Sequence, residues 1–149
     1  MLFMGSKKYP DEAEYMKFVN EHAGSTNAWT SETDTNYYFQ IGNNFIRDGL
    51  DRFAQFFIEP LFDAKAMERE MKAVNSEFEH GLNDDTTRLW RLLKLSASEG
   101  HPFRKFTCGN LKTLNQPNIR TKAIKFYEEH YSANLMKLVI YGKEKCEVL

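Results

Sequence analysis

Two carboxylates on one predicted helix are the residues of this sequence best placed to do chemistry. Glu70 and Glu77 lie seven residues apart, close to two turns of an α-helix, so both project from the same face. Beside them runs an apolar stripe at helical spacing (Met67, Met71, Val74, Phe78). Two such carboxylates could coordinate or support a metal ion, or share acid–base work. A solvated acidic edge of an amphipathic helix has the same spacing, since charged residues usually face water, and both interpretations are open on spacing alone.

Other arrangements of reactive residues are weaker. Glu77 and His80 have the Glu-x-x-His spacing of di-iron bundles, but such a site needs a second copy of the motif, which this sequence lacks. The remaining histidines, His22, His101 and His130, suit structural roles in helices and loops. The sequence has no Gly-rich phosphate loop, and no Cys–His or Ser–His–Asp nucleophile arrangement can be assigned.

The two cysteines indicate a reducing environment. Cys108 and Cys146 are 38 residues apart and have no metal-ligand spacing. In a chain of this size we expect free thiols rather than a disulfide framework, with a single bridge as the alternative.

Composition excludes several classes of function. The chain has 149 residues, 42% of them hydrophobic, and a net charge of −1, so no basic field attracts nucleic acid. No apolar run approaches the roughly 18 residues that a membrane span needs, and the first ten residues lack the features of a secretory signal. We therefore expect a cytoplasmic protein without nucleic-acid or membrane partners.

The elements that must position the carboxylates begin with a helix and a hairpin. An acidic capping box at 11–14 predicts a helix that runs to about residue 24. Alternating residues then predict strands at 27–31 and 35–41, joined as an antiparallel hairpin.

Helices and a last strand follow. Helical spacing predicts a helix from residue 46 that stops at Pro60 and another at 64–80 that carries the carboxylates. A third begins near residue 85 and is predicted to turn four residues inward (Leu89, Leu92, Leu93, Ala97), and a fourth follows Asn118. The apolar run 135–141 suits a central strand. This order predicts an α+β fold with helices packed on one face of a mixed or antiparallel sheet.

Seven stretches also match one peptidase family in order and spacing: 1–10, 21–28, 35–39, 50–57, 60–62, 73–77 and 101–103. The chain resembles, almost end to end, the N-terminal catalytic domain of insulysin-like peptidases in the pitrilysin/insulinase family. So many matches are far more specific than any single motif.

The resemblance implies a metal and a mechanism. Members are zinc metalloendopeptidases with an inverted His-x-x-Glu-His motif, whose two His bind Zn²⁺ and whose Glu is the general base. A Glu on a later helix is the third protein ligand, and this position falls on Glu77. The supporting carboxylate one repeat earlier falls on Glu70, while His80 has no ligand role in the family. The implied reaction is attack of a zinc-activated water on a peptide carbonyl.

The resemblance also implies a substrate-binding strand. Asn27, Ala28 and Trp29 correspond to the edge where an extended peptide adds as a further strand. Trp29 would offer an apolar wall to a substrate side chain. The alternative is an ordinary hairpin aromatic that packs on the core.

One departure from the family limits these implications. No His-x-x-Glu-His occurs in the 149 residues, so two zinc ligands and the general base are absent from the chain. We therefore expect residues 1–149 to form a single partial domain, incomplete at both ends, that binds zinc weakly if at all and does not cleave peptides alone.

Two functional hypotheses follow from different classes. The chain is part of a peptidase whose partners are peptide substrates, the remaining domains of the parent and a second copy in a homodimer. The alternative is a truncated, non-catalytic peptide-binding or regulatory domain.

Overall fold

The structure, a computed structural model, describes residues 2–145, so Met1 and Cys146 lie outside the described residues. It divides into two compact units. Among the described residues, the first takes in 2–27, Tyr38–Asp63 and 120–145, and the second Ala28–Tyr37 and Ala64–Ile119. None of the helices in the described part of the chain is both long and apolar enough to span a bilayer.

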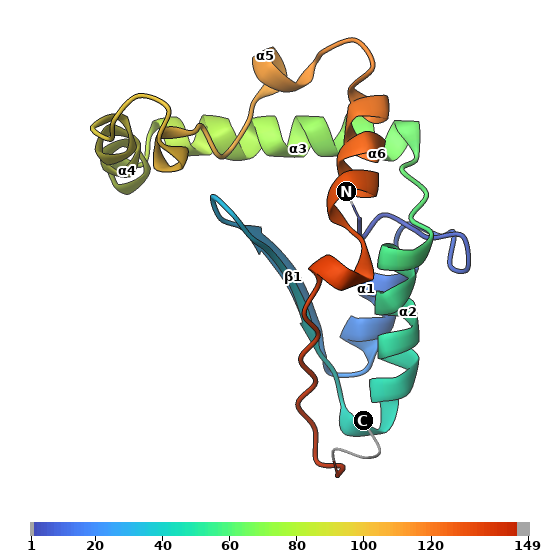
Figure 1. Cartoon of the computed structure of the whole chain (residues 1–149). Coiled ribbons are helices and arrows are strands. Elements are labelled where there is room, and N and C mark those ends of the chain that lie inside the picture. Colours follow the sequence, from blue (N-terminus) through green and yellow to red (C-terminus); the bar gives the residue numbers. More distant parts are fainter. Residues whose placement is uncertain (1, 146–149) are drawn as a thin grey trace. The chain divides into compact units, whose positions relative to one another are not determined.

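Helices dominate the chain, and two strands form one antiparallel hairpin (Figure 1). In order, the elements are α1 (Glu14–Glu21), β1 (Ser25–Thr30), β2 (Thr35–Gln40), η1 (Asn43–Phe45), α2 (Ile46–Ile58), α3 (Ala64–Leu82), α4 (Asp85–Leu95), η2 (Pro102–Arg104), α5 (Leu111–Leu114), α6 (Ile119–His130) and η3 (Ala133–Leu135). The predicted α+β class is confirmed, with an antiparallel sheet rather than a mixed one.

An aromatic cluster forms the core of the first unit. Tyr15 of α1 and Phe53 and Phe56 of α2 are buried, and the Tyr15 ring lies 4.9 Å from that of Phe56. Phe39 of β2 completes the cluster, with its ring 5.0 Å from that of Phe53. Each such ring contributes roughly 2–3 kcal/mol by leaving water. The cluster therefore holds α1 and α2 against one face of β2, as the predicted alternation of this strand requires.

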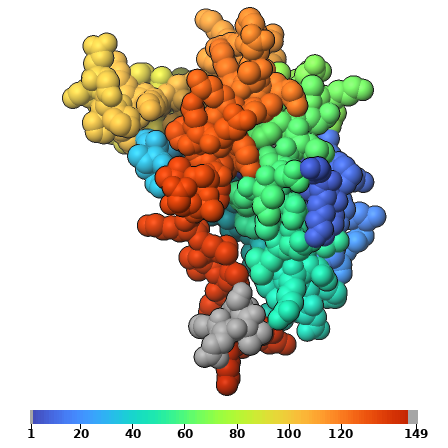
Figure 2. Space-filling model, turned by 45° about the vertical axis from the view of Figure 1, so that its right-hand side comes forward, coloured from blue at the N-terminus to red at the C-terminus, as the bar shows by residue number. Residues whose placement is uncertain are grey.

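The first ten residues are fastened to the end of α2 and the segment after it. Ser6 is buried and forms an antiparallel bridge with Pro60. The Lys7 amide donates to the Glu59 carbonyl at 2.9 Å, and the Leu61 amide donates to that of Gly5 at 3.2 Å. Figure 2 shows these residues in dark blue against the green surface of α2 and its continuation.

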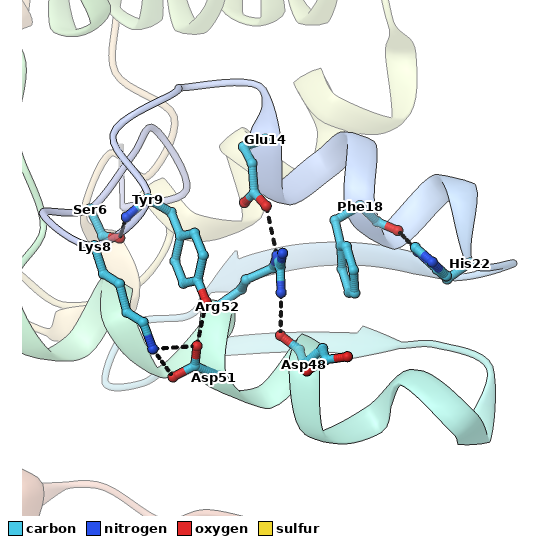
Figure 3. A network of polar contacts seen from close by, with 9 residues as sticks. All are labelled: Ser6, Lys8, Tyr9, Glu14, Phe18, His22, Asp48, Asp51 and Arg52. Atoms are coloured by element: carbon cyan, nitrogen blue, oxygen red, sulfur yellow. Dashed lines mark hydrogen bonds and ion pairs between the residues drawn. The ribbon is translucent and has the colours of Figure 1, made fainter.

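Arg52 of α2 is the centre of a polar network (Figure 3). Its Nε donates to Glu14 Oε1 at 2.7 Å. The guanidinium lies 3.8 Å from the Phe18 ring centroid and 4.7 Å from that of Tyr9. Asp51 accepts hydrogen bonds from Lys8 Nζ and the Tyr9 hydroxyl, which hold the pKa of this carboxyl below its usual value. The network thus joins the N-terminal loop, α1 and α2.

Helix α3 organises the second unit through the predicted apolar stripe. Met67 is buried and Met71, Val74 and Phe78 are half-buried, which confirms the predicted face. α4 packs against α3. It begins at Asp84, whose side chain accepts a hydrogen bond from the Thr87 amide as an N-cap.

The start of α1 differs from the prediction. The helix begins at Glu14, and Asp11 is too far ahead to cap it. Asp11 Oδ1 instead accepts a hydrogen bond from the Ala13 amide at 2.8 Å. Aspartate readily bonds the backbone two residues on, and this local turn competes with capping. The first strand also begins earlier than expected, at Ser25.

The inward face predicted for α4 is wrong. Leu89, Leu92 and Leu93 are 68%, 64% and 49% exposed, while Ala97 is half-buried and Lys94 is buried. Spacing identifies an apolar stripe but not the neighbour that covers it. Here the helix turns a different side toward η2, where the Trp90 and Phe103 rings meet edge-on at 5.7 Å.

The strand predicted at 135–141 is also absent. After η3 the chain is irregular to residue 145, and Leu138, Val139 and Tyr141 are 72%, 88% and 97% exposed. An apolar run becomes a strand only where a neighbouring strand takes up its backbone hydrogen bonds. The sheet formed by the described residues provides no such neighbour for it.

Candidate functional site

The two candidate carboxylates lie on α3, as the spacing predicts. α3 is one continuous helix over Ala64–Leu82, so Glu70 and Glu77 project from the same face. Glu70 is half-buried and Glu77 is exposed. Glu77 makes no hydrogen bond or ion pair with another residue of the described chain, so its carboxylate is available to a ligand. This geometry is compatible with the metal-binding role that the resemblance implies.

A loop after η2 crosses α3 beside Glu77. Phe106 meets Phe78 edge-on, with ring centroids 5.8 Å apart. The Leu111 amide donates to Asn75 Oδ1 at 2.9 Å, and Asn75 Nδ2 donates to Glu79 Oε1 at 2.7 Å. These contacts fix the loop along the helix at Asn75 and Phe78, two residues before and one residue after Glu77.

The loop brings Cys108 close enough to Glu77 for the charge of that carboxylate to act on it, which the sequence pattern does not indicate. Burial, and then the negative charge of Glu77, raise the pKa of the Cys108 thiol. Cys108 is free, as predicted, whereas Cys146 lies outside the described residues. No sequence spacing links Cys108 to Glu77, because the path of the folded loop sets the distance between them.

The described residues do not complete a metal site. Within residues 2–145, no group of three or more His, Cys, Asp and Glu side chains could hold a metal ion. Tetrahedral zinc sites in proteins use three or four protein ligands. The residues around Glu77 in the described part of the chain therefore do not by themselves provide such a ligand set.

The candidate substrate-binding residues lie on β1. The sheet contains only β1 and β2 among the described residues, so β1 is an edge strand. Asn27 is exposed, Ala28 half-buried and Trp29 53% exposed. The exposure of Trp29 favours an apolar wall over a side chain packed in the core. The first unit includes Asn27, whereas Ala28 and Trp29 belong to the second unit with Glu70 and Glu77.

The same unit also contains a buried cation that the sequence pattern did not predict. Lys94 of α4 is 4% exposed, and its Nζ lies 2.5 Å from Glu32 Oε1 in the turn between the strands. Lysines are almost never buried unless paired. Its sequence position, one residue after the apolar run Leu92–Leu93, carries no signal that distinguishes it from a surface lysine.

Comparison with known proteins identifies the family. The family described as Insulinase (Peptidase family M16) matches residues 1–102, more than half of the chain. The chain belongs to the insulinase family of peptidases. The resemblance found in the sequence is thus confirmed at the level of the family. The insulinase family is a family of metallopeptidases.

Insulinase-family relatives match the chain along its length. It is 50% identical to "Insulin-degrading enzyme-like 2" of Arabidopsis thaliana over 99% of the chain, which is 16% of that protein. It is 46% identical to "Insulin-degrading enzyme" of Homo sapiens over 100% of the chain, which is 15% of that protein. The crystal structure of pitrilysin matches with a TM-score of 0.89 and 38% identity, over 98% of this chain and 16% of that one. The chain thus spans about a sixth of the length of these insulinase-family proteins.

Proposed function

We propose that this chain is part of a zinc metalloendopeptidase that hydrolyses small peptides. The observation that carries the proposal is the match, over the whole chain, to relatives named as insulin-degrading enzymes. The geometry is compatible with it, because α3 presents Glu77 exposed and free of competing hydrogen bonds in the described chain. Activity, substrates and partners are proposals for the longer protein, since the chain covers about a sixth of these relatives.

Each candidate residue has a proposed role. Glu77 supplies one zinc ligand, and half-buried Glu70 orients the site from one helical repeat earlier. Asn27, Ala28 and Trp29 hold an extended peptide as an added strand, with backbone hydrogen bonds that tolerate varied sequences. When bound, zinc lowers the pKa of a water and polarises the peptide carbonyl. The His pair and the general base are not in this chain, which alone should be inactive and bind zinc weakly.

A second candidate function is a non-catalytic peptide-binding or regulatory domain. The observation that favours it is the edge position of β1 together with the exposed Trp29. This candidate needs no metal. Binding of a short fluorescent peptide to a chain shown to lack zinc, lost on Trp29→Ala, would support it.

The deciding experiment adds the segment encoded upstream of Met1. If that segment carries His-x-x-Glu-His, we expect the extended protein to bind one zinc per chain and to cleave a quenched fluorescent peptide. Glu77→Gln should then lower zinc affinity about 100-fold or more, because it removes one of three protein ligands. Zinc content by metal analysis and peptide hydrolysis are the measurements.

Glu68→Gln is the matched control, because Glu68 is an exposed carboxylate of the same helix. It should leave zinc content and hydrolysis unchanged. Tight zinc binding by the extended Glu77→Gln variant would refute the assignment of Glu77. Stoichiometric zinc in the 149-residue chain would instead refute the expectation that this chain alone binds zinc weakly. An upstream segment without the motif would favour the non-catalytic function.

The other proposals concern the whole protein. Its remaining domains would complete and enclose the site, and it would form a homodimer in the cytoplasm without nucleic-acid or membrane partners. Sedimentation of the full-length protein tests the dimer.

A further inference from the structure

Lys94 is a buried charge for which the proposed chemistry has no use. It lies in the last turn of α4 and is 4% exposed, among leucines that face solvent. Moving a lysine out of water is costly unless a partner and hydrogen bonds replace its hydration. Its surroundings should therefore explain why the charge is buried there.

The partners of Lys94 come from two other segments of the same unit. Its Nζ donates to Glu32 Oε1 at 2.5 Å, and it lies 5.0 Å from the centroid of the Phe103 ring. The hydrogen bond from Lys94 is the main cause that lowers the pKa of Glu32, so this carboxyl is ionised at neutral pH. Lys94 thus joins the end of α4 to the turn between β1 and β2.

The turn that carries Glu32 is closed by its own hydrogen bonds. The Ser31 amide donates to the Asp34 carbonyl at 2.8 Å, and Ser31 Oγ accepts from the Asp34 amide at 3.1 Å. Ser31 directly follows β1, so a force that holds Glu32 also holds the last residues of that strand. Without these hydrogen bonds the turn would be flexible, and a restraint on Glu32 would not restrain β1.

The end of α4 that carries Lys94 is fixed as well. Arg104 Nη1 donates to the carbonyls of Leu95 and Ala97, each at 2.8 Å, and so occupies acceptors at the helix C-terminus. α4 in turn packs against α3, the helix of Glu77. Both residues of the Lys94–Glu32 pair therefore belong to segments that are themselves held by hydrogen bonds or helix packing.

We propose that Lys94 and Glu32 form a positioning pair that holds the Ala28–Trp29 end of β1 in a fixed place on the α3–α4 part of the unit. This inference rests on the proposed function, in which β1 receives a peptide and α3 carries the metal-binding carboxylate. Neither residue touches the reacting groups. The pair acts by limiting the motion of the strand that binds the substrate.

Amide hydrogen exchange of the 149-residue chain tests the pair directly. We expect Glu32→Gln and Lys94→Met to speed exchange of the β1 and turn amides about tenfold, the size expected when a charge-assisted hydrogen bond that orders a segment is lost. Amides of α1 and α2 should exchange as before. Lys94→Arg, which keeps the cation, should restore slow exchange.

Glu32→Gln is the safer variant, because Glu32 lies in a turn and only Lys94 is in the core. Lys17→Met is the control, since the exposed Lys17–Glu21 pair, 3.9 Å apart, should not affect β1. Unchanged exchange at β1 in both Glu32→Gln and Lys94→Met would overturn the proposal, and so would equal acceleration throughout the chain.

A peptide-binding measurement separates this inference from the proposed function. With a short fluorescent peptide, Glu32→Gln should weaken binding in proportion to the faster exchange. If the unmodified chain binds no peptide while β1 exchange still responds to Glu32→Gln, the pair stands and the peptide-binding role of β1 fails. If the unmodified chain and Glu32→Gln bind the peptide equally and β1 exchange does not change, the positioning role of the pair is refuted and the peptide-binding role of β1 is supported.

Discussion

At the scale of single residues, a few side chains link segments that lie far apart in the chain. The Arg52 guanidinium forms an ion pair with Glu14 and lies over the Phe18 and Tyr9 rings. A lysine there could keep the charge but not the stacked, planar group. Tyr15 likewise fills the core with its ring and directs its hydroxyl to Thr26 Oγ1 at 3.0 Å. Because the Thr26 hydroxyl donates to the Tyr38 carbonyl, the Tyr15 hydroxyl is the donor of that pair.

Tyr15 should make stability depend on alkaline pH. It is 2% exposed, and burial raises its pKa from 10.0 to about 12. The folded state thus favours the neutral phenol. This contribution is complete below about pH 10, where the unfolded tyrosine is also neutral, and is lost as pH rises toward about 12. The loss amounts to roughly 3 kcal/mol.

Tyr15→Phe is the test. It should cost about 1 kcal/mol at neutral pH through the lost hydrogen bond, and it should flatten the fall in stability above pH 10. Urea unfolding of both proteins at a series of alkaline pH values measures this. An equally steep fall in the variant would show that other groups control alkaline unfolding.

At the scale of elements, α2 packs so closely on β2 that one position of the helix has no room for a side chain. Gly49 of α2 faces Phe39 of β2, and an added Cβ would lie 2.9 Å from Phe39 Cε2. The Phe39 ring cannot retreat, because it packs against Phe53 and Tyr15. Glycine lowers helix propensity, yet here its small size allows α2 to reach the sheet.

Gly49→Ala should therefore destabilise the protein by about 1–3 kcal/mol, the cost of overpacking, although alanine is the better helix former. Gly81→Ala is the control. Its Cβ would meet only the exposed Thr87 side chain, at 3.1 Å, so its effect should stay within about 1 kcal/mol. Denaturant unfolding compares the two. Equal effects would argue against tight packing of α2 on β2.

At the scale of the whole molecule, two compact units carry apolar side chains that the described residues leave uncovered. One such group lies on α4 and consists of Leu89, Trp90, Leu92 and Leu93, each about half or more exposed. Contiguous exposed leucines of this kind favour association. The chain spans about a sixth of the length of these relatives.

The isolated chain should therefore self-associate through this face. Leu92→Glu should reduce association in sedimentation experiments without lowering the melting temperature, because Leu92 is already 64% exposed. Met67→Ala, at a buried position of α3, should instead cost about 2–5 kcal/mol and leave association unchanged. A Leu92→Glu variant that melts at a markedly lower temperature would show that Leu92 is buried in solution.

The sequence by itself determined the α+β class, the hairpin, the helices α2 and α3, and Glu70 and Glu77 on one face. These depend on local periodicity, which a short window of residues contains. Family membership could also be recognised from the sequence, because the order and spacing of the matching stretches can be compared with the family without a structure. The roles of Glu77 and Trp29 stay predictions.

Tertiary structure alone decided which faces are covered and which distant residues meet. The run 135–141 is apolar but has no strand beside it in the described chain, and α4 buries Lys94 while its leucines face solvent. The pairing of Lys94 with Glu32, 62 residues away, and the effect of the Glu77 charge on Cys108 depend on the paths of loops. Local pattern has no information about such contacts, because burial is a property of what packs against a residue and not of the residue itself.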